Sequence, residues 1–184
     1  MVVNGTTGES PTVAWEEVAA LVQETRDARK GTAIPIVVTG TNATASTVAR
    51  TEDAGRLGAD AVLVVVPYYS RPSEEGIVAH YREVARVGVP IIVYEVPYRT
   101  GVRLSADTMR KIMDLDGIIG LKDSSGSLEL VQELNRYESK PILCGEDILF
   151  HAMLSQGASG GILASANVAP INSPKSTGWP GRAS

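Results

Sequence analysis

The sequence predicts an α/β protein in which short apolar strands alternate with helices around one parallel sheet. Strand, loop and helix patterns recur with a period of roughly 25 to 30 residues, as in proteins built from βα units. The predicted strands are continuous runs of Val, Ile and Leu, which is typical of parallel strands covered by helices. With 184 residues, of which 43% are hydrophobic, the chain is long enough for one good core and is expected to form one domain.

The first third of the chain shows how the elements are recognised. A short apolar start (2–4) is followed by a glycine turn (5–10), and a helix is expected from residue 12 to Gly31. The acidic pair Glu16 and Glu17 suits the first turn of that helix. Its apolar face is formed by Trp15, Val18, Ala19, Val22 and Thr25. The next segment, 34–39, is too short and too rich in β-branched residues for a helix, so it is predicted to be a buried strand.

The remaining elements follow the same cycle. Helices are expected over 47–57, which Gly58 ends, and over 74–87, which Gly88 ends. Ser105 is a predicted N-cap for a helix ending near Asp114. Further helices are predicted over 127–137 and 147–156. The predicted strands are 61–66, 90–96, 118–122, 141–145 and 162–165, with loops at 67–73 and 97–101.

Two architectures fit a repeated βα pattern: an open doubly wound sheet and a closed barrel. No glycine fingerprint for a dinucleotide follows the first strand. The turn Gly5-Thr6-Thr7-Gly8 also lacks the lysine of a phosphate-binding P-loop. The sequence therefore favours the barrel, although seven strands are predicted and closure needs eight.

Composition excludes several classes of function. A net charge of −4 and a pI near 5.2 give no electrostatic reason to bind nucleic acid or an anionic membrane. No apolar run approaches membrane-spanning length, and no signal-type segment begins the chain. The single cysteine, Cys144, lies in an apolar run and is predicted to be a buried, inert thiol, which suits a cytoplasmic protein.

Polar side chains gather at one position in the repeating unit, at or just beyond the ends of the predicted strands. The carboxyl ends of the strands in a parallel barrel share one face, so these side chains are expected to converge there. They are Thr6, Thr7, Thr39, Tyr68, Tyr69, Tyr94, Arg99, Lys122 and Glu146.

Lys122 is the expected centre of any chemistry, because it ends a buried apolar strand. Burial favours the neutral amine, and a neutral amine can attack a ketone carbonyl to form a Schiff base. On this segment alone a structural explanation competes, since lysines often end strands with their long stems reaching water.

The other candidates also have two interpretations. The Gly5-Thr6-Thr7-Gly8 turn offers backbone N–H groups and two hydroxyls to a carboxylate, or is an ordinary capped turn. Tyr94 either passes a proton or packs its ring on a helix. Tyr68 and Tyr69, in a stiff exposed loop, suit a subunit interface as well as a site. Arg99 either binds a carboxylate with both nitrogens or is a solvated surface residue.

The two histidines, His80 and His151, fall within predicted helices and lack metal-ligand spacing. Both are expected to be structural, and no metal site is predicted.

Four motifs, taken in order along the chain, resemble one family. They are Gly5-Thr6-Thr7-Gly8-Glu9-Ser10, Pro67-Tyr68-Tyr69-Ser70-Arg71-Pro72, Tyr94-Glu95-Val96-Pro97-Tyr98-Arg99-Thr100-Gly101 and Gly120-Leu121-Lys122-Asp123. Together they are similar to the dihydrodipicolinate synthase and N-acetylneuraminate lyase family of Schiff-base, pyruvate-dependent lyases. The similarity runs from Val2 to about Pro170.

The resemblance implies a (β/α)8 TIM barrel and a role for each motif residue. Lys122 would form the Schiff base with pyruvate without any other cofactor. Thr6, Tyr94 and Tyr69 would relay protons, with Tyr69 reaching into the site of a neighbouring subunit in a dimer of dimers. The substrate would be bound by Thr7, Gly5, Arg99 and the backbone of Ile162.

The resemblance also implies a substrate. Arg99 stands where dihydrodipicolinate synthases hold the carboxylate of aspartate semialdehyde, so condensation of that aldehyde with pyruvate, the committed step to lysine and diaminopimelate, is the favoured reaction. The segment from Lys122 to Gly126 is shared with 2-keto-3-deoxy sugar-acid aldolases, which are the alternative. Glu95 departs from the Asn or Asp that usually follows the tyrosine.

The resemblance implies that the barrel is truncated. Family members carry a further strand and helix before Val2 and a C-terminal helical region after Pro170. Residues 1–170 are thus expected to form a partial TIM-barrel catalytic domain, and 171–184 a disordered tail unlike the family. A non-catalytic barrel fragment is the second alternative.

Overall fold

The computed structural model describes residues 1–28, 35–137 and 139–168. Every strand in this part of the chain is parallel to its neighbours, and the strands pair in the order in which they occur in the sequence. The strands are β1 (Val2–Val3), β2 (Ile36–Val38), β3 (Ala61–Val65), β4 (Ile91–Glu95), β5 (Ile118–Asp123), β6 (Ile142–Cys144) and β7 (Gly160–Gly161).

Helices connect the strands of the sheet. They are α1 (Trp15–Ala28), α2 (Thr44–Arg56), α3 (Glu74–Ala85), α4 (Pro97–Thr100), α5 (Ala106–Met113), α6 (Glu129–Leu134) and α7 (Phe150–Ser155). Short 3₁₀ helices also occur, at η1 (Thr6–Gly8), η2 (Ser10–Thr12), η3 (Asp147–Leu149) and η4 (Ala164–Asn167). The predicted cap is confirmed, because the Ser105 hydroxyl accepts a hydrogen bond from the backbone N–H of Thr108 at 3.2 Å.

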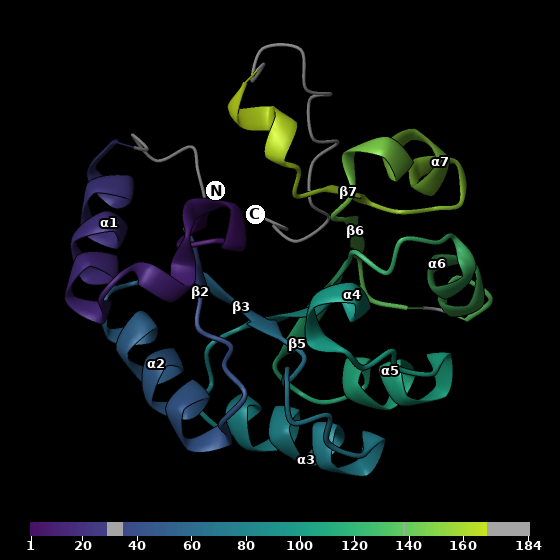
Figure 1. The fold of residues 1–184 in the computed structure, drawn as a ribbon, viewed down its shortest axis with the longest axis horizontal. Helices are drawn as coiled ribbons and strands as arrows, with labels where there is room; N and C mark the ends of the chain where they lie inside the picture. The colour runs from purple at the N-terminus through teal and green to yellow at the C-terminus, as the bar shows by residue number, and fades with distance from the viewer. Residues whose placement is uncertain (29–34, 138, 169–184) are drawn as a thin grey trace, which may run out of the picture.

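The sheet is curled, and all of its helices except α4 lie on the convex side. Figure 1 shows α1, α2, α3, α5, α6 and α7 arranged in chain order around the strands, whereas the single turn α4 lies inside this ring. Among the described residues, β1 pairs only with β2 and β7 pairs only with β6, so the ladder does not close. This arrangement confirms the prediction of a partial parallel barrel. None of the helices in this part of the chain combines the length and apolar character that a membrane crossing requires.

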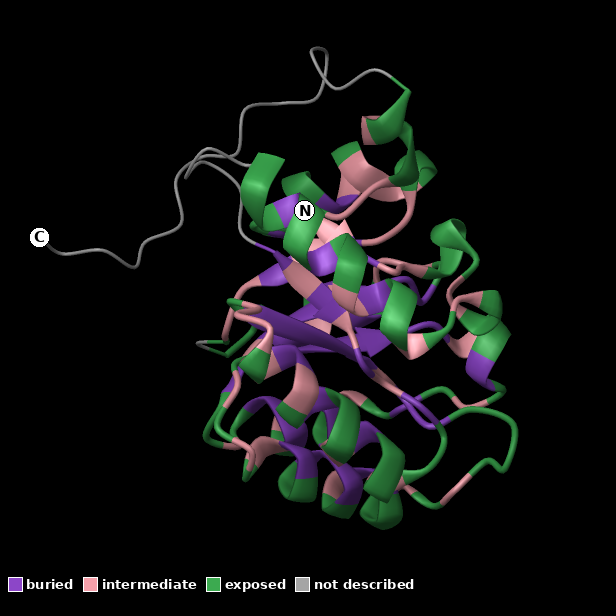
Figure 2. Ribbon diagram, turned by 90° about the vertical axis from the view of Figure 1, so that its left-hand side faces the viewer, coloured by how far each residue is buried: buried purple, intermediate pink, exposed green. Residues whose placement is uncertain are grey.

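Two apolar cores lie on opposite faces of the sheet. The larger core joins the outward-facing residues of the strands to the helices, and its fully buried members include Val64, Val93 and Leu121. The smaller core lines the concave face and contains Leu63, Ile92, Tyr94 and Val96. The purple strands of Figure 2 are buried, whereas the helices show green outer surfaces.

A β-bulge in β5 decides which face Lys122 occupies. The register with β4 shifts, since Ile91 pairs with Ile118 but the next residue, Ile92, pairs with Gly120. As a result Ile118 and Leu121 both face the helices, while Ile119 lies on the concave side. An extra residue in one strand reverses the alternation beyond it. Lys122 thereby becomes the register partner of Tyr94.

Several predicted boundaries are corrected. The last strand is not 162–165 but β7 at Gly160–Gly161, and residues 164–167 form η4 instead. The chain turns there because the backbone N–H of Ser165 donates to a carboxylate oxygen of Asp147 at 3.3 Å.

The predicted loop at 97–101 contains the single helical turn α4, which a proline begins. The first long helix begins at Trp15, because the proline and turn residues before it form η2. The predicted helix end at Gly31 and the predicted tail at 171–184 lie outside the described residues.

Candidate active site

Lys122 lies at the carboxyl end of β5, which is flanked in the sheet by β4 and β6. It pairs in register with Tyr94 on one side and with Leu143 on the other. Its Nζ lies 4.3 Å from the centroid of the Tyr94 ring. The two residues that the sequence placed at the centre of the chemistry are thus in direct contact.

The environment of Lys122 favours the neutral amine. The side chain is partly buried, and burial lowers the pKa of Lys122 below its ordinary value. The charge of Glu146 opposes this effect, and so do the more weakly acting Cys144 and Asp147. The Tyr94 ring also favours a cation, through its π face. Burial outweighs these effects, so a larger share of the amine is neutral than in a solvated lysine.

Gly145 makes room for the lysine side chain. A Cβ atom built on Gly145 would lie 2.0 Å from the Oγ of Ser124 and 2.8 Å from the Cε of Lys122. The backbone of Gly145 is meanwhile fixed, since its N–H donates to the carbonyl of Asp123 at 2.8 Å. Sequence reasoning missed Gly145, although its place directly after β6, beside the predicted catalytic strand, was a usable signal.

Tyr94 is a buried phenol with a raised pKa. Burial is the main cause, and the neighbouring hydroxyl of Ser124 and the charge of Arg99 act in the opposite direction. Ser124 Oγ makes no hydrogen bond of regular geometry, which leaves a buried hydroxyl beside the phenol and the amine. A protonated phenol at this position is suited to donating a proton to an oxygen held over Lys122.

The Gly5-Thr6-Thr7-Gly8 turn follows β1 at the same end of the sheet. It forms η1, in which the N–H of Gly8 donates to the carbonyl of Gly5 at 2.8 Å. Thr6 and Thr7 are exposed. Within the described residues, no hydrogen bond links either hydroxyl to Lys122 or Tyr94, so their substrate roles stay predictions.

Arg99 lies on α4, directly beyond β4, and is exposed. Its guanidinium carbon stands 5.3 Å from the centroid of the Tyr98 ring, and its Nε donates weakly to the Tyr98 hydroxyl at 3.4 Å. The charge of Arg99 acts to lower the pKa of Tyr94, and the charge of Glu146 acts to raise the pKa of Arg99, so the three side chains interact electrostatically. The guanidinium is therefore available at the mouth of the site for an anionic group.

Tyr69 points into solvent, as the sequence predicted. It is 89% exposed and adopts a left-handed backbone conformation with φ of 71°. Its N–H donates to the carbonyl of Thr100 at 3.3 Å, which docks the tyrosine loop onto α4. Its phenol contacts neither Tyr94 nor Lys122 among the described residues.

Thr39 does not point into the site, contrary to expectation. It is fully buried on the helix side of β2, and its hydroxyl shares a hydrogen bond of 2.9 Å with that of Thr51 on α2. The alternation of side chains along β2 places it on the same face as Val37 and opposite to Ile36 and Val38.

Four further residues considered from the sequence lie outside the contact between Lys122 and Tyr94. Cys144 is a buried free thiol, as predicted. His80 is buried and shares a hydrogen bond of 2.9 Å with Thr44, whereas His151 is exposed on α7. Ile162 extends the β6–β7 ladder, because its N–H donates to the carbonyl of Cys144 at 2.8 Å.

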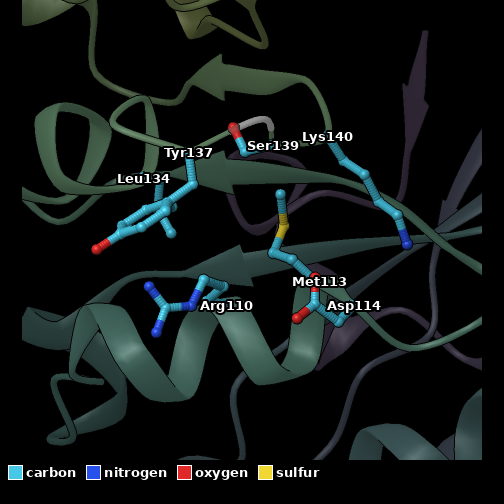
Figure 3. Close-up of a pocket in the computed structure, with 7 residues that line it drawn as sticks. All are labelled: Arg110, Met113, Asp114, Leu134, Tyr137, Ser139 and Lys140. Atoms are coloured by element: carbon cyan, nitrogen blue, oxygen red, sulfur yellow. The ribbon is translucent and has the colours of Figure 1, made fainter.

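A surface cavity of about 260 Å³ lies elsewhere, between the ends of α5 and α6 and the start of β6 (Figure 3). Its walls include Met113 and Leu134, and the guanidinium of Arg110 stacks 4.6 Å from the centroid of the Tyr137 ring. This end of the sheet carries the amino ends of the strands, where parallel barrels are stabilised rather than catalytic. Within the described chain, no cluster of His, Cys, Asp or Glu is arranged to hold a metal ion.

Comparison with protein families identifies the chain. The model of the dihydrodipicolinate synthetase family matches residues 1–175. This chain belongs to that family. The four motifs that resemble this family all lie at or just beyond the carboxyl ends of strands, namely β1, β3, β4 and β5.

Individual members of the dihydrodipicolinate synthetase family agree with the assignment. The chain is 41% identical over 173 residues to the 4-hydroxy-tetrahydrodipicolinate synthase of Thermomicrobium roseum, covering 90% of this chain and 56% of that protein. The dihydrodipicolinate synthase of Thermotoga maritima superposes with a TM-score of 0.88 at 36% identity, over 92% of this chain and 60% of that one.

A further solved relative carries a ligand. The chloride-inhibited dihydrodipicolinate synthase of Acinetobacter baumannii, complexed with pyruvate, superposes with a TM-score of 0.88 at 35% identity, over 92% of this chain and 59% of that one. This chain therefore spans less than two thirds of the length of the relatives it matches. The curled, open sheet corresponds to part of their TIM barrel.

Proposed function

We propose that this chain carries the Schiff-base centre of a synthase that condenses pyruvate with aspartate semialdehyde to 4-hydroxy-tetrahydrodipicolinate. The observation that carries the proposal is the contact between Lys122 and Tyr94, in which a desolvated amine lies 4.3 Å from the ring of a buried phenol. The names of the curated relatives and the pyruvate bound to the Acinetobacter baumannii enzyme support the choice of substrate.

The first step is formation of the imine. The neutral Nζ of Lys122 attacks the keto carbon of pyruvate, and the resulting carbinolamine loses its hydroxyl as water once that oxygen is protonated. Tyr94 is the proposed proton donor, since its raised pKa keeps the phenol protonated. Thr6 and the Tyr69 of a neighbouring subunit are proposed to complete the relay, in keeping with the exposure of Tyr69.

The second step forms the carbon–carbon bond. Loss of a proton from the methyl group of the imine gives an enamine. Its carbon attacks the aldehyde carbon of the second substrate, and the aldehyde oxygen takes up a proton to become a hydroxyl. The amino group of that substrate then attacks the imine carbon, which closes the ring and releases the Lys122 amine. Thr7, Gly5 and the backbone of Ile162 are proposed to hold the pyruvate part. Arg99 is proposed to bind the carboxylate of aspartate semialdehyde, for which its exposed guanidinium is available.

Borohydride trapping tests the imine. The protein is incubated with pyruvate, reduced and weighed, and one reduced pyruvyl group is expected on the wild-type chain. The adduct disappears in Lys122→Ala and persists in Lys140→Ala. Lys140 is the matched control, because it is partly buried and its Nζ donates to the carbonyl of Leu115 at 3.0 Å, away from Tyr94. A folded wild-type chain without an adduct would identify a non-catalytic barrel fragment.

Acceptor profiling separates the proposed reaction from a 2-keto-3-deoxy sugar-acid aldolase. Arg99→Ala is expected to reduce turnover of aspartate semialdehyde roughly 100-fold or more, because a carboxylate loses its charged partner. Equal activity of Arg99→Ala and the wild type with this aldehyde would favour the aldolase.

A further inference from the structure

Two buried carboxyl groups lie directly behind the candidate active site. Glu95 follows Tyr94 on β4, and Asp123 follows Lys122 on β5, so each carboxyl side chain faces the helices while its neighbour faces the site. The two acids are register partners, and parallel strands lie about 4.8 Å apart. Each residue is only 1% exposed.

One oxygen of each carboxyl group is hydrogen-bonded, and the other is not. Glu95 Oε1 accepts from the backbone N–H of Leu104 at 3.1 Å, and Asp123 Oδ1 accepts from that of Ser125 at 2.8 Å. Glu95 Oε2 and Asp123 Oδ2 are buried without any hydrogen-bond partner. Two such oxygens are costly if both groups are ionised, whereas a proton shared between these register partners would give both oxygens a hydrogen bond.

The surroundings of the pair favour retention of a proton. The groups that face it are Glu74 and Tyr81 on α3, Arg103 before α5, Glu129 and Glu133 on α6, Cys144 on β6, and Glu146 beyond β6. Among these described groups Arg103 alone is cationic, and its guanidinium donates to the carbonyl of Ser125 at 2.9 Å. Burial raises the pKa of Glu95 to about 7 and also raises that of Asp123.

We propose that Glu95 and Asp123 share one proton at neutral pH and act together as positioning residues for Tyr94 and Lys122. The proposal deepens the proposed function and rests on it, since positioning has meaning only for the imine-forming pair. Neither acid touches the substrate in this scheme.

The hydrogen bonds around the pair explain how it acts on the site. Through Leu104, Glu95 fixes the segment that begins with α4 and carries Arg99. Through Ser125, Asp123 fixes the turn after β5, and the carbonyl of Glu95 accepts from the N–H of Ser124 at 2.8 Å. Loss of the shared proton leaves two like charges on adjacent strand ends, and their repulsion separates the strands where Tyr94 contacts Lys122.

Three variants separate the effect of the shared proton from that of the hydrogen bonds. In Glu95→Gln the amide accepts from Leu104 and donates to Asp123 without needing a proton. In Asp123→Asn the amide likewise accepts from Ser125 and donates to Glu95. Glu95→Leu replaces the carboxyl side chain with an apolar one of similar size and therefore removes the hydrogen bonds.

Infrared spectroscopy detects the proton directly and does not depend on catalysis. The wild type is expected to show a buried carboxylic-acid carbonyl band at pH 6 that fades as the pH rises through about 7, and neither Glu95→Gln nor Asp123→Asn is expected to show it. A wild-type spectrum without this band, or a band unchanged in both variants, overturns the proposal.

The pH profile of pyruvate trapping tests the positioning role. Neutralisation of the Lys122 amine raises the rate of both proteins with pH, so the readout is the ratio of the wild-type rate to the Glu95→Gln rate. This ratio is expected to fall as the pH rises through about 7. Glu95→Leu is expected to lose roughly tenfold or more in rate across the range. Identical profiles for the wild type and Glu95→Gln overturn the positioning role. If the wild type forms no adduct at all, the proposed function fails, and the infrared result still decides whether the pair shares a proton.

Discussion

At the scale of single residues, the site depends on two small features beside Lys122. The amine is desolvated enough for its pKa to fall, yet the carboxylate of Glu146 prevents a larger fall. The side chain also needs the space that Gly145 leaves. The sequence alone predicted that Lys122, Tyr94 and Arg99 lie at one end of the sheet, because each is at or just beyond the end of a predicted strand. The same argument was wrong for Thr39, because a strand-end residue faces the site or the helices according to the alternation of the strand.

Gly145→Ala is expected to impair imine formation with little change in the fold. The added Cβ would press on the Cε of Lys122 and the Oγ of Ser124, and the amine would move away from Tyr94. A displacement of this kind lowers a reaction rate by roughly 10- to 100-fold. The rate of pyruvate trapping measures the loss. Gly160→Ala is the matched control, since its Cβ would make an ordinary contact of 3.6 Å with Leu143; equal losses in both variants contradict the explanation.

At the scale of the elements, apolar strands were predictable and two irregularities were not. Runs of Val, Ile and Leu predicted β2 to β6 because their side chains are buried on one or both faces. β7 consists of two glycines, which carry no hydrophobic pattern. The bulge in β5 was hidden because Ile118, Ile119 and Leu121 are all apolar, so nothing in the sequence shows which face each occupies.

The backbone at the bulge in β5 leaves no room for a side chain at Gly120. A Cβ at this position would lie 2.8 Å from the carbonyl oxygen of Pro141, which is backbone and cannot rotate away. Gly120→Ala is expected to lower the free energy of unfolding by roughly 1–3 kcal/mol, measured by urea denaturation. Gly76→Ala, in the first turn of α3, should instead be neutral or stabilising, because helices favour alanine and the nearest atom is 3.4 Å away. Destabilisation by Gly76→Ala of the same size would refute this account.

His80 on α3, which bonds to Thr44 on α2, is expected to make the stability of the fold depend on pH. Burial lowers the pKa of His80 from 6.5 to about 4, so the folded state excludes a proton that the unfolded state binds between these values. The free energy of unfolding contributed by the neutral ring is therefore present above pH 6.5 and lost as the pH falls towards 4, by about 3 kcal/mol in total.

His80→Gln isolates this effect, since an amide can still bond to Thr44 but does not titrate. The free energies of unfolding of the wild type and of His80→Gln are measured by urea denaturation at pH 7 and at pH 4.5. The difference between the two proteins at each pH cancels the contribution of the carboxyl groups. The wild type should lose more stability than the variant. A difference that is independent of pH shows that His80 titrates normally in the folded state.

At the scale of the whole molecule, the repeat of βα units predicted the parallel order of the sheet and the placement of its polar residues. The sequence could not show how far Thr6 and Thr7 lie from Lys122, because that distance depends on the curvature of the whole sheet rather than on any local pattern. Nor could it show whether Tyr69 completes a site in another subunit, which depends on contacts between chains. The contact between Lys122 and Tyr94 is different, since β4 and β5 form it locally and both lie in the middle of the pairing order.

If Lys122 forms the proposed imine, pyruvate is expected to stabilise the entire fold, because the lysine lies within a cooperative sheet. Binding to the folded state alone raises the free energy of unfolding by about 2.7 kcal/mol at a concentration 100 times the dissociation constant, a rise of roughly 5–10 °C in Tm. Lys122→Met cannot form the imine and also removes the cost of burying an amine, so it should be more stable than the wild type without pyruvate. Its Tm should not respond to pyruvate. Calorimetry of both proteins with and without the keto acid measures the two effects. An equal pyruvate shift in both would place the binding elsewhere than at Lys122.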